Sequence, residues 1–120
     1  LYYFSFRKNR NPEDYRRAVE NYQKATELDP AYSDAFHGLG VAYLQSGKYA
    51  EAMASLKRGL ELNPGLDEAY YFLGLACFEM GNASEAYQHL TKYKSTPSYN
   101  LLSPSAKASV ENLIAKCKPG

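Results

Sequence analysis

Few side chains in this sequence could bind a metal ion or act as a nucleophile. The strongest candidates are two histidines and two cysteines, His37, His89, Cys77 and Cys117. A zinc site needs several His, Cys or carboxylate ligands together, often at short fixed spacings. The two histidines are far apart, and we find no cysteine or carboxylate at ligand spacing from either. The cysteines fit no metal-ligand spacing and no secreted disulfide framework. We therefore expect no metal site and no cofactor.

Two further features could suggest catalysis, but neither is specific. Cys77 lies on the apolar stripe of a predicted helix, where a thiol is buried and unreactive. Gly38-Leu39-Gly40 resembles a phosphate-binding loop, but such loops follow a strand, whereas this segment lies inside a predicted helix. The carboxylates are scattered over solvated helix faces. We find no catalytic site and expect that the protein is not an enzyme.

The composition is that of one nearly neutral domain. The 120 residues include 14 Lys and Arg against 13 Asp and Glu, which is enough chain for a single hydrophobic core. This charge balance gives no reason to expect nucleic acid or an acidic membrane surface as a partner. Two cysteines without a disulfide pattern favour a reducing compartment, and we expect a cytoplasmic location.

Residues 33–64 are predicted to form two amphipathic helices joined by a tight turn at Ser46-Gly47. Their apolar residues recur at the 3.6-residue period of a helix. These residues are Phe36, Leu39, Gly40 and Tyr43 in the first helix, and Tyr49, Ala52, Met53, Leu56 and Leu60 in the second. Asn63-Pro64 ends the second helix, because proline disfavours helical geometry in the residue before it. Such a hairpin cannot bury its apolar faces alone, so it needs neighbours.

Helical patterns also cover residues 11–28, 65–80, 82–94 and 103–118. Asn11-Pro12 has the character of a helix start, and Asn82 with Glu85 three residues later is a capping signature. Residues 95–102 are predicted to form a polar connection. The sequence therefore predicts an all-α protein.

These segments repeat with a period of 34 residues. The equivalent residues are Pro30 and Pro64; Ala18, Ala52 and Ala86; Tyr22, Leu56 and Leu90; Phe36 and Tyr70; Leu39 and Leu73; Gly40 and Gly74; and Gly47 and Gly81. A helix–turn–helix unit with this period resembles the tetratricopeptide repeat. In residues 33–64 the family pattern appears as Phe36, Leu39-Gly40, Tyr43, Ala52, Leu56, Gly59 and Pro64.

The resemblance implies a right-handed α-solenoid of antiparallel helix pairs, with about six or seven helices in one domain over residues 1–120. We divide the domain into a partial first repeat at 1–30, a second at 33–64, a third at 67–95 and a capping helix at 103–118. The third repeat has bulky Tyr93 where Ala25 and Gly59 stand, and Ser98 where proline is expected. We therefore expect the last helix to close the array.

The resemblance also implies a protein–protein interaction module, a scaffold or adaptor. In this family the first helix of each pair lines a concave groove that holds a segment of a partner protein. The groove positions are Asp34, His37, Val41, Leu44 and Gln45 in the second repeat, and Glu68, Tyr71, Leu75, Phe78 and Glu79 in the third. The family's carboxylate clamp for chaperone tails is basic, whereas its positions here hold Tyr3, Arg7, Gly38, Glu68 and Phe72. We therefore do not expect binding of chaperone tails. We expect a protein or peptide ligand in a mainly apolar and aromatic groove with an acidic fringe at Asp34, Glu68 and Glu79, and no small-molecule substrate.

Other readings of the same residues stay open. Val41, Leu44, Leu75 and Phe78 could instead be covered by the chain's own N-terminal segment, by its last helix or by a second copy. Self-association (homo-oligomerisation) through the incompletely covered helix at 11–28 is an alternative function. An RNA-binding helical repeat is a weaker alternative, because acidic side chains line the groove.

Residues 1–10 begin aromatic and become basic at Arg7, Lys8 and Arg10. This segment is either the tail of a first helix or the cytoplasmic end of a membrane span, although its apolar run is far shorter than the roughly 20 residues that cross a bilayer. An apolar run upstream of Leu1 would make this the cytoplasmic domain of a membrane-anchored protein. A repeat there would make it the end of a longer solenoid. We expect the chain to be part of a larger protein.

Overall fold

A computed structural model describes residues 12–118, which form seven α-helices and no strand. The helices are α2 (Pro12–Leu28), α3 (Ser33–Gln45), α4 (Tyr49–Leu62), α5 (Asp67–Glu79), α6 (Ala83–Lys94), α7 (Pro97–Asn100) and α8 (Pro104–Cys117). The predictions for residues 1–10 and the cap at Asn11 lie outside the described residues. None of the helices within residues 12–118 has the length and apolar character needed to cross a bilayer.

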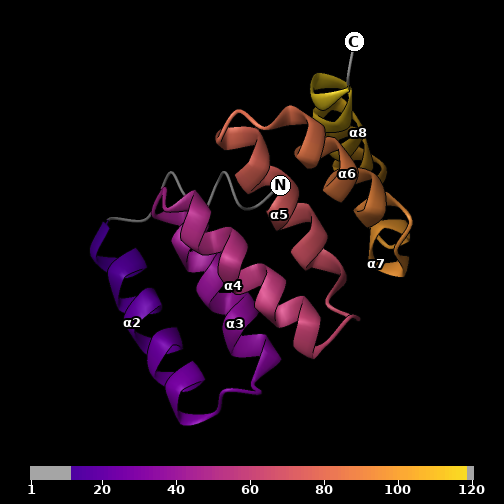
Figure 1. Cartoon of the computed structure of the whole chain (residues 1–120). Helices are drawn as coiled ribbons and strands as arrows, with labels where there is room; N and C mark the ends of the chain where they lie inside the picture. Colours follow the sequence, from indigo (N-terminus) through magenta and orange to yellow (C-terminus); the bar gives the residue numbers. More distant parts are fainter. Residues whose placement is uncertain (1–11, 119–120) are drawn as a thin grey trace.

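The helices form a row of antiparallel pairs (Figure 1). Helix α3 packs on α4, and α5 packs on α6, as the two predicted hairpins require. Contacts of α2 with α3, of α4 with α5 and of α6 with α8 join these pairs into one array, with α2 and α8 at opposite ends. The prediction of an all-α solenoid is confirmed.

Two glycines make the tight turns inside the hairpins. Gly47 and Gly81 have φ angles of 81° and 82°, in the left-handed region where a Cβ atom is strained. The backbone N–H of Gly47 donates to the carbonyl of Leu44, and that of Gly81 donates to the carbonyl of Phe78. The same local geometry therefore ends the first helix of both repeats.

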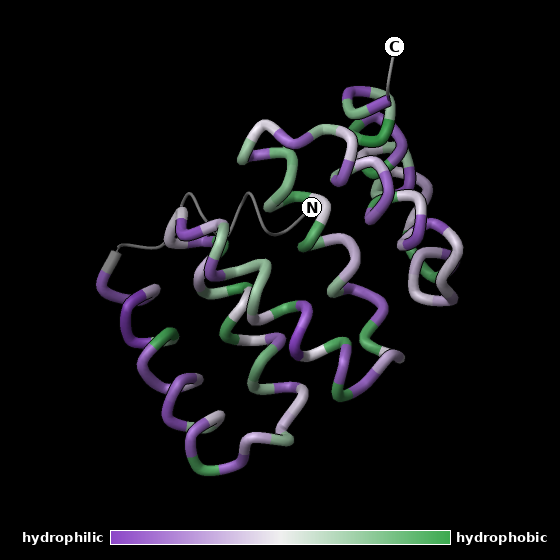
Figure 2. The backbone as a smooth tube through the Cα atoms, in the orientation of Figure 1, coloured by the Kyte–Doolittle hydropathy of each residue, from purple (hydrophilic) through white to green (hydrophobic). Residues whose placement is uncertain are grey.

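Helix α5 is the centre of the core. Every residue from Tyr71 to Cys77 is buried, so α5 is covered on all sides and not along one stripe. Figure 2 shows the contrast, because α5 is largely hydrophobic after its first turn whereas α2 is mostly hydrophilic. Consequently, a residue on the predicted groove face of α5 can also be a core residue.

The segment at 95–102 differs from its predicted polar connection, because it contains helix α7. Thr96 caps this helix by accepting a hydrogen bond from the backbone N–H of Tyr99, and Pro97 occupies its first turn. Tyr99 is buried with its ring 5.9 Å from that of Tyr93. The bulky Tyr93 thus anchors α7, which leads the chain into the last helix.

Helix α8 begins where the sequence predicts. The Ser103 side chain accepts a hydrogen bond from the backbone N–H of Ala106, and Pro104 follows the cap. Val110 and Cys117 are fully buried against the rest of the chain. The helix therefore covers the end of the third repeat with an apolar inner face.

Candidate functional site

The most coherent candidate site is a hollow between α5 and α8. Its volume is about 400 Å³, within the range of ligand-binding pockets. It is lined by Tyr71, Leu75, Phe78 and Glu79 from α5, and by Ser109, Asn112, Leu113 and Lys116 from α8. The structure therefore brings together four of the five residues predicted from the third repeat.

The hollow combines an apolar floor with a polar rim. Leu75 is buried and Phe78 and Leu113 are half-buried, whereas Glu79 and Lys116 are exposed and carry opposite charges. Tyr71 is packed from behind, with its ring 5.4 Å from Phe72 and 5.5 Å from Tyr93. These aromatic neighbours hold Tyr71 in place on one wall of the hollow.

The α8 lining was not among the residues predicted from the sequence. Ser109, Asn112, Leu113 and Lys116 recur at the spacing of a single helix face. This spacing is visible in the sequence and could have indicated a second lining face. Our prediction for this helix instead uses only its apolar positions, which we assign to a capping role. The orientation of α8 against α5 depends on tertiary packing, so the sequence alone does not show that this face borders the groove.

His37 of α3 lies against α5, the first helix of the third repeat. Its ring meets Phe72 edge-on at a centroid distance of 5.7 Å. Burial lowers the pKa of His37, while the charges of Glu68 and Asp34 act in the opposite direction. Within residues 12–118, its Nδ1 is a buried nitrogen without a hydrogen-bond partner. Glu68 and Asp34, the two predicted groove acids near His37, are both exposed.

The other predicted residues of the second repeat are placed differently. Leu44 has no exposed surface and belongs to the core, and Val41 packs against that core while half-buried. Asp34 borders a second hollow of about 350 Å³, next to Tyr22 and Tyr32. These three residues therefore do not share a single surface with the α5–α8 hollow.

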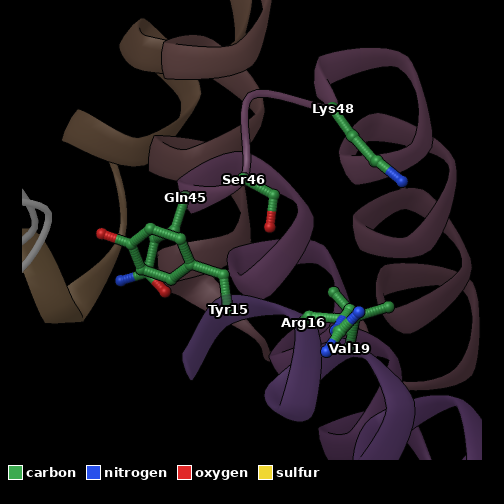
Figure 3. Close-up of a pocket in the computed structure, with 6 residues that line it drawn as sticks. All are labelled: Tyr15, Arg16, Val19, Gln45, Ser46 and Lys48. Carbon is green, nitrogen blue, oxygen red and sulfur yellow. The ribbon is translucent and has the colours of Figure 1, made fainter. Parts of the chain in front are cut away.

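Gln45 borders a third hollow, of about 440 Å³, between α2 and the turn after α3. Figure 3 shows Tyr15, Arg16 and Val19 coming from α2, and Gln45, Ser46 and Lys48 from the end of α3 and its turn. Gln45 is 8% exposed. Gln45, which the resemblance predicts to line the groove, thus lies against α2.

The expectation that neither histidine has a ligand partner is wrong for His89. Its Nε2 lies 3.3 Å from Oε2 of Glu85, one helical turn earlier, and the Cys77 sulfur belongs to the same cluster. Burial, together with Glu85, raises the pKa of the Cys77 thiol to about 11. The i, i+4 spacing of Glu85 and His89 was visible in the sequence, whereas the approach of Cys77 needs the fold.

Comparison with known proteins identifies the repeat. A tetratricopeptide-repeat family model matches residues 12–64 and, overlapping them, residues 43–95. No curated protein sequence matches the chain.

Solved structures share the fold. The type III secretion chaperone SycD of Yersinia enterocolitica, in complex with a peptide of the translocator YopD, is 19% identical with a TM-score of 0.76, over 96% of this chain and 88% of that one. The first tetratricopeptide-repeat domain of Spaghetti (RPAP3), bound to the HSP90 peptide SRMEEVD, is 20% identical with a TM-score of 0.74, over 87% and 80%. MamA is 27% identical with a TM-score of 0.67, over 88% and 58%.

Proposed function

The chain belongs to the tetratricopeptide-repeat family, and on this basis we propose that it is a non-catalytic protein–protein interaction module. In this proposal it binds a peptide segment of a partner protein in the hollow between α5 and α8. The observation that carries the proposal is the convergence of Tyr71, Leu75, Phe78 and Glu79 with one face of α8.

The structural neighbours support a peptide as the ligand. Both the SycD structure and the Spaghetti structure were solved with a peptide of another protein. Their fold covers most of this chain, which supports a peptide-binding role for it as well. Their low identity leaves the ligand's sequence to be decided by the residues of this chain.

The lining favours a peptide with an apolar anchor. A volume of about 400 Å³ is small for a binding pocket, so it fits side chains of a segment whose backbone lies across the rim. Phe78 and Leu113 offer apolar contact, while Ser109 and Asn112 can exchange hydrogen bonds with a peptide backbone. Glu79 and Lys116 can pair with charges flanking the anchor.

A chaperone tail ending in carboxylates fits this chain poorly. The described positions that correspond to the family's carboxylate clamp hold Gly38, Glu68 and Phe72, none of which is basic. Glu68 would repel an anionic peptide end. We therefore propose a partner segment that is anchored by apolar side chains and not by a terminal carboxylate.

A peptide-display selection tests the proposal. Peptides selected on the wild-type chain would be measured by fluorescence polarisation against Phe78→Ala. Phe78 is half-buried, whereas Tyr71 is 6% exposed and belongs to the core, so Phe78 is the safer substitution. We expect binding to weaken about 30-fold, as for loss of a side chain worth about 2 kcal/mol.

Phe36→Ala is the matched control, because Phe36 is also a half-buried phenylalanine but does not line the hollow. It should leave peptide affinity unchanged, with the helicity of both variants checked by circular dichroism. Equal affinity of Phe78→Ala and wild type, or amide shifts on peptide addition that avoid α5 and α8, would contradict the proposal.

Self-association remains the second candidate function. It is favoured by exposed apolar side chains near the α2 end of the array, because Tyr22, Leu28 and Tyr32 are 39%, 81% and 48% exposed. Light scattering over a range of concentrations tests it. A dimer that Leu28→Lys dissociates supports self-association, and a monomer at every concentration excludes it.

We also propose a cytoplasmic setting within a larger protein. Both cysteines are free and buried, which suits a reducing compartment. Each repeat of a solenoid packs only on its neighbours, so a further repeat or a membrane tether next to this domain is compatible with the proposal.

A further inference from the structure

Three side chains with metal-binding atoms meet where α5 packs on α6. Cys77 lies near the end of α5, and Glu85 and His89 lie one turn apart on α6. Their candidate ligand atoms, a sulfur, a carboxylate oxygen and an imidazole nitrogen, all lie within 4.8 Å of one another. In a tetrahedral zinc site, ligand atoms about 2.0–2.3 Å from the metal are separated by about 3.3–3.8 Å. The 3.3 Å between Glu85 and His89 already matches that spacing.

Neighbouring groups orient the carboxylate toward the cluster. Asn82 Nδ2 donates to Oε1 of Glu85 at 3.1 Å, while the Asn82 side chain also accepts from the Glu85 backbone N–H. The other oxygen, Oε2, is therefore the one that faces His89. Such outer partners fix the direction of metal-ligating groups.

The cluster is open on one side. Cys77 is fully buried, but the side chains of Glu85 and His89 are 32% and 20% exposed. A metal ion can thus enter from solvent, and a water molecule can complete four-coordination. Lys57, whose Nζ lies 3.6 Å from Oε2 of Glu85, is 53% exposed and can move away without leaving a buried charge unpaired.

From this geometry we propose that Cys77, Glu85 and His89 form a Zn²⁺ site that links α5 to α6. Zn²⁺ accepts sulfur, nitrogen and oxygen ligands in one site. A thiolate and a carboxylate together neutralise its charge, and binding displaces the Cys77 thiol proton. The ion would replace Lys57 as the cation beside Glu85 and would join the two helices of the third repeat.

Met53 makes Cu(I) the competing choice. Its sulfur lies 3.9 Å from that of Cys77, and thioether and thiolate ligands favour Cu(I). The carboxylate argues for Zn²⁺, because carboxylates are poor ligands for a soft monovalent ion. The two metals can be separated by experiment.

The test uses the reduced, metal-free chain titrated with Zn²⁺ against a chromophoric chelator, and with Co²⁺ as a spectroscopic substitute. We expect one Zn²⁺ per chain, and a thiolate-to-cobalt charge-transfer band in the near ultraviolet. His89→Gln and Glu85→Gln should each weaken Zn²⁺ binding by at least about tenfold, the lower end of the effect of losing even an indirect metal partner. Cys77→Ser should abolish the charge-transfer band.

The chain provides a matched control for each ligand. His37→Gln, Cys117→Ser and Glu51→Gln change the same residue types outside the cluster and should leave Zn²⁺ affinity unchanged. Cys77 is in the core, so its substitution can disturb folding. If Cys77→Ser loses helicity, the test rests on Glu85→Gln and His89→Gln, which change partly exposed side chains of α6.

Three results would overturn the proposal. They are the absence of Zn²⁺ binding, Zn²⁺ binding that survives both His89→Gln and Glu85→Gln, and an equal loss of affinity in Cys117→Ser. Binding of Cu(I) through Cys77 and Met53 without binding of Zn²⁺ would also refute the assignment of the metal.

Discussion

Leu56 of α4 packs directly on the backbone of Gly40 in α3. A Cβ atom on Gly40 would lie 2.5 Å from Cγ of Leu56, closer than side chains approach. Leu90 stands in the same relationship to Gly74 in the next repeat, also at 2.5 Å. The lack of a side chain at the equivalent glycine of each repeat therefore allows the two helices of each hairpin to pack closely.

Ala52→Leu should destabilise the fold through the same contact. Ala52 is fully buried, and its carbonyl oxygen would lie 3.2 Å from a Cβ atom on Gly40. There is no room for a larger side chain, so we expect a loss of about 1–3 kcal/mol in the free energy of unfolding, measured with urea.

Ala54→Leu is the control, because Ala54 is exposed on the same helix and should tolerate leucine with little change. An unchanged thermal midpoint for Ala52→Leu would refute the assignment of Ala52 to the contact between α3 and α4.

Asp67→Ala should weaken the attachment of α7. Oδ2 of Asp67 accepts hydrogen bonds from the Ser98 hydroxyl at 2.9 Å and from the Ser98 backbone N–H at 3.3 Å. Hydrogen bonds to a charged, partly buried group are worth about 1.5–3 kcal/mol. We expect a loss in the lower part of that range by urea unfolding, and a shift of the Tyr99 ring signals in NMR spectra.

Glu51→Ala provides the comparison, because Glu51 is an exposed acid in the first turn of α4, whereas Asp67 is a half-buried acid in the first turn of α5. Both substitutions remove a favourable charge at a helix N-terminus. Equal effects of the two would mean that the Ser98 hydrogen bonds add nothing.

Lys94→Met should raise the pKa of Glu111. Lys94 Nζ lies 3.0 Å from Oε1 of Glu111, and this hydrogen bond and charge hold the carboxyl pKa below its usual range. A carboxyl whose pKa is lowered by folding stabilises the fold above its unfolded pKa, and this contribution is lost as the pH falls through the folded value. The acid side of the stability profile should therefore flatten in Lys94→Met.

NMR titration of the Glu111 side-chain carboxyl measures the shift directly. Lys24→Met, which removes an exposed lysine from α2, should leave the Glu111 pKa unchanged. Because the pair is exposed, added salt should also reduce the difference between Lys94→Met and wild type. A Glu111 pKa that is the same with and without Lys94 would contradict the prediction.

The sequence by itself determined the described helices other than α7, the turns between the predicted helices, and their repetition. Apolar spacing, the caps at Asn82 and Ser103, and the glycines at 47 and 81 act between residues that are close along the chain. The 34-residue period also predicts which helices pack together, since each repeat packs mainly on its neighbour.

Only the tertiary structure decided which faces remain accessible. Leu44 has the helical spacing of a groove residue but is buried in the core, whereas Leu75, Phe78 and Glu79 border a hollow that α8 completes with Leu113 and Lys116. The proximity of Cys77 to His89 also could not be predicted from the sequence. These relationships depend on the angle and distance at which helices pack, and residues far apart along the chain fix both.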